Sequence, residues 1–254
     1  MRLFDILTIA IGSGLLLALA VMIVRRRLHR EYPFFFGYIV VSLIRSVSLL
    51  PLSGNFQLYL YGYWTTEVLV DILALLGLHE AFYECFYGFY LFWWFRLIFP
   101  GLAAIITALC IGNAMLKPVP RIPLWIVLIF SLDSAVSYIK AGIFVLFMLL
   151  VVFLHMRWRR YPYDIALGFA VSSLGTLASY ALLSKVSRYA LIVKYAPPLT
   201  FILGTGIWLW SFAGKFEPAP TPEWKHDITP LQLLEQMKDY IRTMKKAVRR
   251  PNDF

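Results

Sequence analysis

Seven apolar stretches, each long enough to cross a lipid bilayer, limit how this chain can fold more than any other feature. An α-helix needs about 20 mainly apolar residues to span the hydrocarbon core, where an open backbone finds no hydrogen-bond partners. The sequence therefore predicts an all-α, polytopic membrane bundle of seven transmembrane helices over residues 1–213. The stretches are 4–24, 33–52, 58–78, 97–115, about 134–156, 162–183 and 189–213. The apolar run of the fifth begins at Ile122, which fits either a tilted helix or a short outer helix followed by a span.

Composition agrees with this assignment. The chain is 60% hydrophobic and 15% charged, with a mean hydropathy of +0.71, whereas soluble domains carry about 25% charged residues. A chain with 17% aromatic residues also has too much apolar surface for a disordered protein. The first stretch is not followed by a small-residue cleavage site, so we interpret it as a retained helix rather than a signal peptide.

The net charge of +10 could suggest nucleic acid as a partner, but the positions of the basic residues point to membrane topology instead. The loops after the first, third and fifth stretches, together with the tail, hold 16 Lys and Arg residues, against five on the other side. Because basic loops stay in the cytoplasm, we expect the amino terminus outside and the carboxyl terminus inside. No nucleic-acid partner is expected.

Residues 214–254 form the one sizeable polar segment. Residues 214–229 contain Pro218, Pro220 and Pro222, which is typical of a stiff linker. A basic amphipathic helix is predicted over 230–250, after the Thr229-Pro230 start signal. We expect it to lie on anionic lipid or to dock onto a cytoplasmic protein partner. Its contact residues would be Lys238, Arg242, Lys245, Lys246, Arg249 and Arg250.

Six ionisable side chains lie within the predicted spans, where they are costly unless they find partners inside the bundle. Arg45 lies about 10 Å from the outer end of its span and Glu67 about 13 Å from the outer end of the next, so the two are predicted to pair. Glu67 and Asp71, four residues apart, share one face of their helix, and Asp133, Ser137 and Lys140, spaced by four and three, share a face of another. The pattern predicts a polar cluster in the outer half of the bundle.

The last span adds Lys194, followed by Pro197 and Pro198. Each proline leaves the carbonyl four residues earlier without its helical donor. Transporters bind substrates and ions at broken helices of this kind, although the prolines could also produce a simple kink. The candidate ligand-binding residues are Arg45, Glu67, Asp71, Lys140, Lys194, Pro197 and Pro198. Structural ion pairing and a proton path are the other interpretations.

Other patterns are weaker. His79, Glu80 and Glu84 resemble a metal-binding face but lack a second histidine, which favours a wetted helix end. A stripe of small residues, Gly168, Ser172, Gly175 and Ser179, favours close helix packing. Cys85 and Cys110 lie at apolar segments and offer neither a disulfide framework nor a metal knuckle. No arrangement indicates catalysis, a metal or a cofactor.

Four segments carry a resemblance: 32–46 (YPFFFGYIVVSLIRS), 63–67 (YWTTE), 139–144 (IKAGIF) and 165–172 (IALGFAVS). Through them the chain resembles uncharacterised seven-helix bacterial inner-membrane proteins. The resemblance covers most of the predicted bundle but not the tail. It implies a multi-pass location in the inner membrane and brings no substrate or reaction with it.

Three functions remain open. A non-enzymatic receptor or scaffold-like protein would sense a small ligand in the outer polar cluster and report through its tail. A secondary transporter would use the same cluster and the proline break, but the inner halves of the spans offer few polar residues for a path. A structural subunit of a membrane complex would need the charges only to hold helices together.

Overall fold

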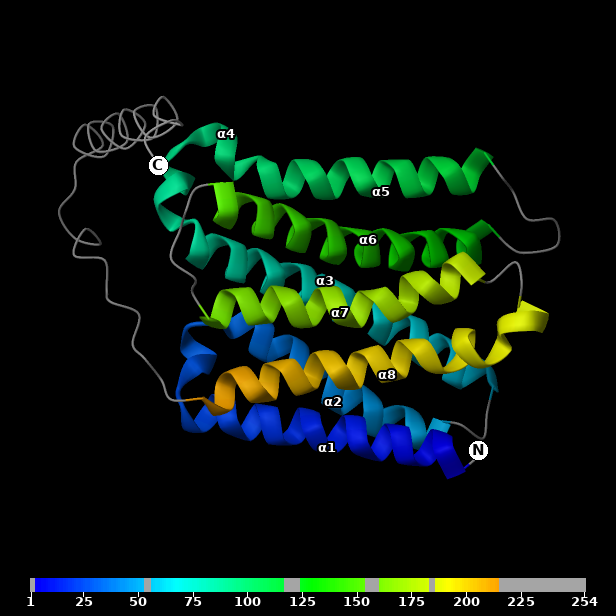
Figure 1. The fold of residues 1–254 in the computed structure, drawn as a ribbon. Coiled ribbons are helices and arrows are strands. Elements are labelled where there is room, and N and C mark those ends of the chain that lie inside the picture. Colours follow the sequence, from blue (N-terminus) through cyan, green and yellow to red (C-terminus); the bar gives the residue numbers. More distant parts are fainter. Residues whose placement is uncertain (1–2, 53–55, 117–123, 154–159, 183–185, 215–254) are drawn as a thin grey trace, which may run out of the picture. The chain divides into compact units, whose positions relative to one another are not determined.

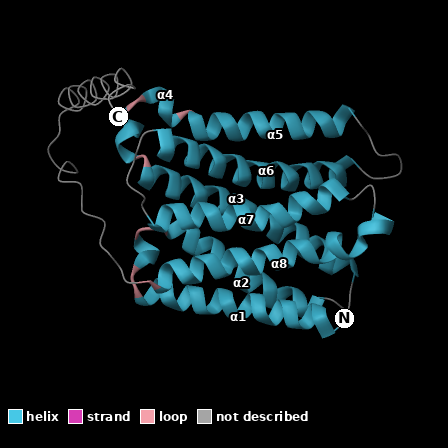
Figure 2. Cartoon of the chain, in the orientation of Figure 1, coloured by secondary structure: helices cyan, strands magenta, loops and turns pink. Residues whose placement is uncertain are grey.

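The computed structural model describes residues 3–52, 56–116, 124–153, 160–182 and 186–214, and within them all regular structure is helical (Figure 2). Short helical segments η1 (Leu28–Arg30), η2 (Tyr87–Leu91) and α4 (Trp93–Arg96) lie between the longer ones. The long helices are α1 (Leu3–Arg25), α2 (Pro33–Leu52), α3 (Phe56–Cys85), α5 (Ile98–Leu116), α6 (Leu124–Phe153), α7 (Arg160–Leu182) and α8 (Val186–Ala213).

Each long helix coincides with one predicted span, so the all-helical assignment is confirmed. Two helices are longer than predicted, because α3 continues to Cys85 and α6 begins at Leu124 as a single 30-residue helix. Within the described residues, five segments are long and apolar enough to cross a membrane: Leu7–Arg25, Trp93–Asn113, Val127–Phe153, Arg160–Leu182 and Val193–Ala213. Helix α2 contributes a shorter apolar segment, Pro33–Ser48. Seven spans and the orientation remain predictions.

Helices α7 and α8 run antiparallel with their backbones in close contact (Figure 1). Glycines allow this approach. A Cβ on Gly175 would lie 2.5 Å from the Ala196 carbonyl oxygen, and a Cβ on Gly204 would lie 2.6 Å from that of Gly168. Trp208 covers Gly168 in the same way, so a side chain there would collide with the indole. The small-residue stripe of α7 therefore lies along α8, as the spacing predicted.

Aromatic rings fill the half of the bundle near the Arg25–Arg30 end. Phe35 meets Trp208 edge-on at 5.1 Å between centroids, and Phe169 meets the same indole at 5.0 Å. All three rings are completely buried. A second buried group packs beside them, formed by Phe82 on α3, Phe86 just after it, Phe95 on α4 and Phe147 on α6. This half of the molecule is a close-packed apolar core.

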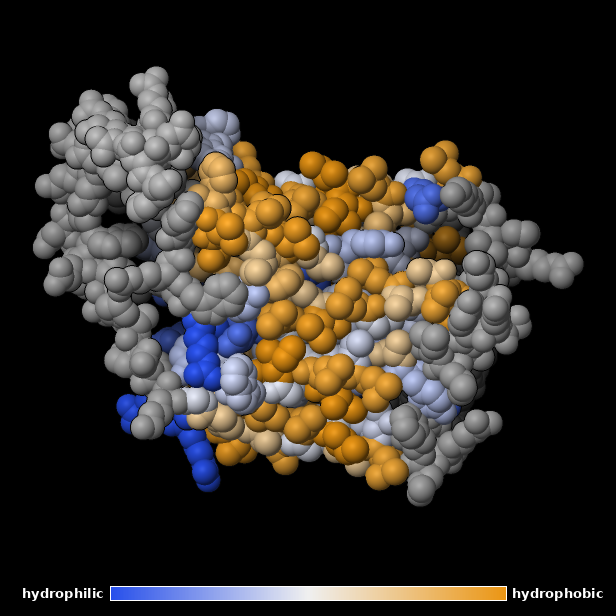
Figure 3. All heavy atoms as spheres, in the orientation of Figure 1, coloured by the Kyte–Doolittle hydropathy of each residue, from blue (hydrophilic) through white to orange (hydrophobic). Residues whose placement is uncertain are grey.

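Basic side chains hold the last turn of α8. Arg26 donates hydrogen bonds to the carbonyls of Gly214 at 2.5 Å and Ala213 at 3.0 Å, and Arg160 donates to that of Trp210 at 3.2 Å. These carbonyls have no donors within their own helix, so the guanidinium groups cap the helix end. Figure 3 shows hydrophilic residues gathered where α1 ends and α7 begins, and apolar residues along the helix sides. The predicted linker and tail helix, 214–229 and 230–250, fall almost entirely outside the described residues.

Candidate functional site

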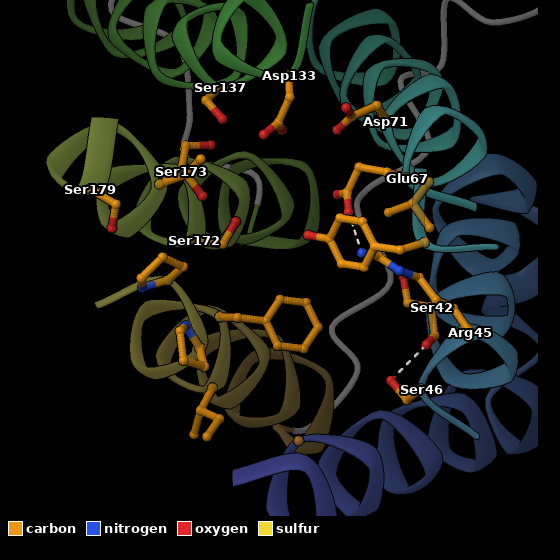
Figure 4. Close-up of a pocket in the computed structure, with 18 of the residues that line it drawn as sticks. Ser42, Arg45, Ser46, Glu67, Asp71, Asp133, Ser137, Ser172, Ser173 and Ser179 are labelled. Carbon is orange, nitrogen blue, oxygen red and sulfur yellow. Dashed lines mark hydrogen bonds and ion pairs between the residues drawn. The ribbon is translucent and has the colours of Figure 1, made fainter. Parts of the chain in front are cut away.

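A cavity of about 610 Å³ opens among six helices, in the half of the bundle away from the Arg25–Arg30 end. Its walls come from the first half of α1, residues 38–46 of α2, 63–71 of α3 and 133–140 of α6, the second half of α7 and the first half and middle of α8 (Figure 4). The polar residues among its lining are Thr8, Ser13, Tyr38, Ser42, Arg45, Ser46, Tyr63, Glu67, Asp71, Asp133, Ser137, Lys140, Ser172, Ser173, Thr176, Ser179 and Tyr180. We call this cavity the polar pocket.

Two ion pairs lie in the wall of the polar pocket. Arg45 on α2 donates to the Glu67 carboxylate on α3, which confirms the predicted pair, and its guanidinium also lies 4.5 Å from the centre of the Tyr63 ring. Lys140 on α6 binds Asp71 on α3, with 3.2 Å between Nζ and Oδ1. The four side chains are only 11 to 17% exposed, so each pair compensates charges that would be costly to bury alone.

Asp133 is held differently from the other two acids. Its carboxylate accepts a hydrogen bond from the hydroxyl of Tyr180 on α7, and no lysine or arginine within the described ranges forms an ion pair with it. The oxygens of Glu67, Asp71 and Asp133 nevertheless all lie within 4.8 Å of one another. Three carboxylates from α3 and α6 therefore converge on one wall of the pocket (Figure 4).

Helix α8 forms the opposite wall with Pro197, Pro198 and Phe201, and it stays helical through both prolines. The broken helix that the prolines suggested is absent from this described segment. Ser179 explains the continuity, because its hydroxyl lies 3.1 Å from the Val193 carbonyl, the group that Pro197 deprives of a donor. A hydroxyl from the neighbouring helix, which also lies 2.9 Å from the Gly175 carbonyl, thus partly replaces the missing amide.

Lys194 lies on an exposed face of α8, with its ammonium 5.0 Å from the centre of the Tyr195 ring. Within the described part of the chain it is not among the pocket-lining residues, unlike Arg45, Glu67, Asp71, Lys140 and the two prolines. The structure therefore brings six of the seven candidate residues together. Lys194 is separated from them because α8 turns it away from the pocket.

Tyr38 and Ser42 were not among the candidates, although both line the pocket from α2. Tyr38 packs edge-on against Phe169 at 5.0 Å and Trp208 at 5.9 Å, so it forms the floor between the pocket and the aromatic core. Ser42 is 6% exposed, and its hydroxyl lies near that of Tyr38 without forming a well-directed hydrogen bond to a described residue. A tyrosine or serine in an apolar helix gives no sequence signal by itself, which is why these residues were missed.

The suspected metal-binding face at the other end of α3 is occupied by contacts within the protein. His79 lies 3.3 Å from the Tyr90 hydroxyl and packs on Phe99. Glu80 accepts a hydrogen bond from the Phe35 amide at 3.2 Å and so caps the start of α2. Burial raises the pKa of Glu80 to about 7, although the hydrogen bond from Phe35 acts in the opposite direction. Burial lowers the pKa of His79. These residues lie just beyond the predicted span 58–78.

Comparisons with protein-family models, curated proteins and solved structures find no match to this chain.

Proposed function

We propose that this protein is a non-enzymatic, multi-pass inner-membrane receptor or sensor that binds a small polar ligand in the polar pocket. The observation that carries the proposal is the pocket itself. Its volume of about 610 Å³ falls within the roughly 300 to 1,000 Å³ of small-molecule sites. Charged and hydroxyl groups from six helices converge on it, and in such sites a few placed polar groups fix the orientation of the ligand.

The floor of the pocket favours binding over passage. A transporter must open its site to both sides of the membrane in turn. Here Tyr38 closes the pocket, and the buried rings of Phe169 and Trp208 lie beneath it. A ligand that enters from the outer side would meet a packed apolar core. Under the predicted orientation, the pocket faces outward and the tail lies in the cytoplasm, where its basic residues would contact anionic lipid or a protein partner.

Gly12 and Gly14 provide a matched pair of variants to test this proposal. Gly12 is buried and lines the pocket, and a Cβ built on it has Phe201 as its nearest neighbour, at 4.0 Å. Gly14 is exposed on the same helix, with nothing within 4 Å of its Cβ position. Gly12→Leu should therefore fill the pocket, whereas Gly14→Leu should leave it open.

The experiment measures thermal unfolding of the purified protein with a panel of small anions, amines, amino acids and sugars. We expect at least one compound to stabilise the wild type and Gly14→Leu but not Gly12→Leu. Each stabilising compound is then tested for flux in proteoliposomes. Binding without flux supports a receptor, and flux supports the alternative of a secondary transporter. If nothing binds, both proposals fail and a structural subunit of a membrane complex remains.

A further inference from the structure

The charges of the polar pocket do not balance. Its ionisable lining within the described residues comprises three carboxylates and two cations. Arg45 is paired with Glu67, and Lys140 with Asp71. Asp133 has the Tyr180 hydroxyl as its hydrogen-bond donor, which brings no positive charge. With all five groups ionised, the site therefore carries one uncompensated negative charge, and a single positive charge on a ligand would neutralise it.

The spacing of the three acids suits an ammonium group. An ammonium donates three hydrogen bonds of about 2.8 Å in tetrahedral directions, which places the three acceptors about 4.6 Å from one another. One carboxylate oxygen from each of Glu67, Asp71 and Asp133 lies within 4.8 Å of the other two. They come from two helices and face the same cavity, so a group between them could reach all three.

Ser42 supplies a second and independent sign of a ligand. Its hydroxyl is buried in the wall of the pocket near the Tyr38 hydroxyl, but it forms no well-directed hydrogen bond with a described residue. Buried hydroxyls nearly always have a partner. Figure 4 shows Ser42 beside Arg45 and Glu67. A polar group of a ligand held in this part of the pocket would satisfy the hydroxyl.

The size of the pocket favours an organic cation over a bare ion. The cavity of about 610 Å³ extends from the carboxylates to the opposite wall, where Thr176 and Phe201 offer a hydroxyl and an apolar surface. We propose that the pocket binds a small organic monovalent cation whose ammonium group lies among Glu67, Asp71 and Asp133. This inference rests on the proposed function, because it names the chemical class of the ligand.

The test compares charged and neutral probes of equal size on the purified full-length protein. Propylammonium and benzylammonium chlorides are titrated against propanol, benzyl alcohol and sodium chloride, with calorimetry and thermal unfolding as readouts. We expect an ammonium probe to bind and its alcohol analogue not to bind. Asp133→Asn should weaken ammonium binding at least tenfold. The matched control is Asp164→Asn, because Asp164 lies at the other end of the bundle beside Arg160, 3.8 Å away.

Other results would overturn the inference in distinguishable ways. If the alcohols bind as well as the amines and Gly12→Leu blocks both, the pocket binds ligands but the ammonium class is wrong. If sodium alone stabilises the protein, the site is one for an inorganic ion. If no probe binds, the inference fails, and the proposed function fails only if the wider panel also gives no binding. Should Asp133→Asn not fold, Gly12→Leu decides, because it should abolish ammonium binding by filling the pocket, whereas Gly14→Leu should leave that binding unchanged.

Discussion

The hydroxyl of Ser179 on α7 lies 3.1 Å from the carbonyl of Val193 on α8, the group that Pro197 leaves without a helical donor. The same hydroxyl also lies 2.9 Å from the Gly175 carbonyl within its own helix. One serine therefore links two helices at the point where the second would otherwise break. This contact compensates for the first of the two prolines that lie in the pocket wall, while α8 stays helical through both.

Ser179→Ala should lower the stability of the protein by about 1 kcal/mol, because a buried carbonyl loses its donor. Thermal unfolding in detergent measures the effect. Ser172→Ala is the matched control, since the Ser172 hydroxyl bonds only to the Phe169 carbonyl in the same helix within the described structure. Equal melting temperatures for the two variants would contradict a supporting role for Ser179.

Glu67→Gln should destabilise the protein by about 3 to 5 kcal/mol, because it leaves the Arg45 guanidinium buried without its ion-pair partner. Arg45→Gln should have a similar effect through Glu67. The double variant should lose less stability than the two single variants together, and a double-mutant cycle of chemical or thermal unfolding measures this coupling. Strictly additive losses would show that the pair contributes nothing.

Gly175→Ala should strongly destabilise the contact between α7 and α8. A Cβ at this position would lie 2.1 Å from the Thr200 hydroxyl and 2.5 Å from the Ala196 carbonyl oxygen, and the backbone oxygen cannot move without shifting α8. Gly206→Ala, on α8, should be neutral or slightly stabilising, since nothing lies within 4 Å of its Cβ position. The helix packing described above would be wrong if both variants melted at the wild-type temperature.

Glu80 should make stability depend on pH. Its ordinary pKa of 4.5 is raised to about 7 in the folded protein, so the folded state holds this proton more strongly than the unfolded state. Its contribution to stability is complete below pH 4.5 and is lost as the pH rises through 7. Glu80→Gln should remove that loss. The melting temperatures of the variant and the wild type are measured from pH 5 to 8. If both change with pH by the same amount, the prediction is wrong. The comparison isolates Glu80 because His79 is present in both proteins.

Much of the fold follows from the sequence because bilayer thickness dictates the length of an apolar helix. The pairing of Arg45 with Glu67 was predictable for a related reason, since their matching depths limited the choice of partner. The position of Lys194 was not predictable in this way. The sequence predicts how deep a residue lies along its span. The side to which its side chain points depends on how the helix is rotated about its axis, and for α8 the glycine contacts with α7 fix that rotation.

Tyr180 and Ser42 show a second limit. Both residue types are common in apolar helices, where tyrosine contributes ring surface and serine can bond to its own backbone. Their importance arises only from what lies opposite, which is the Asp133 carboxylate for one and the polar pocket for the other. Such relationships between distant helices carry no local signal in the sequence.

The hydrogen bonds that Arg26 and Arg160 donate at the end of α8 have a mechanical consequence. Pro197, Pro198 and Phe201 form part of the pocket wall, and the same helix ends at carbonyls gripped by Arg26 and Arg160. A ligand that tilts α8 would therefore strain the hydrogen bonds of Arg26 and Arg160 at the far end, so that a displacement at the pocket reaches the opposite end of the helix.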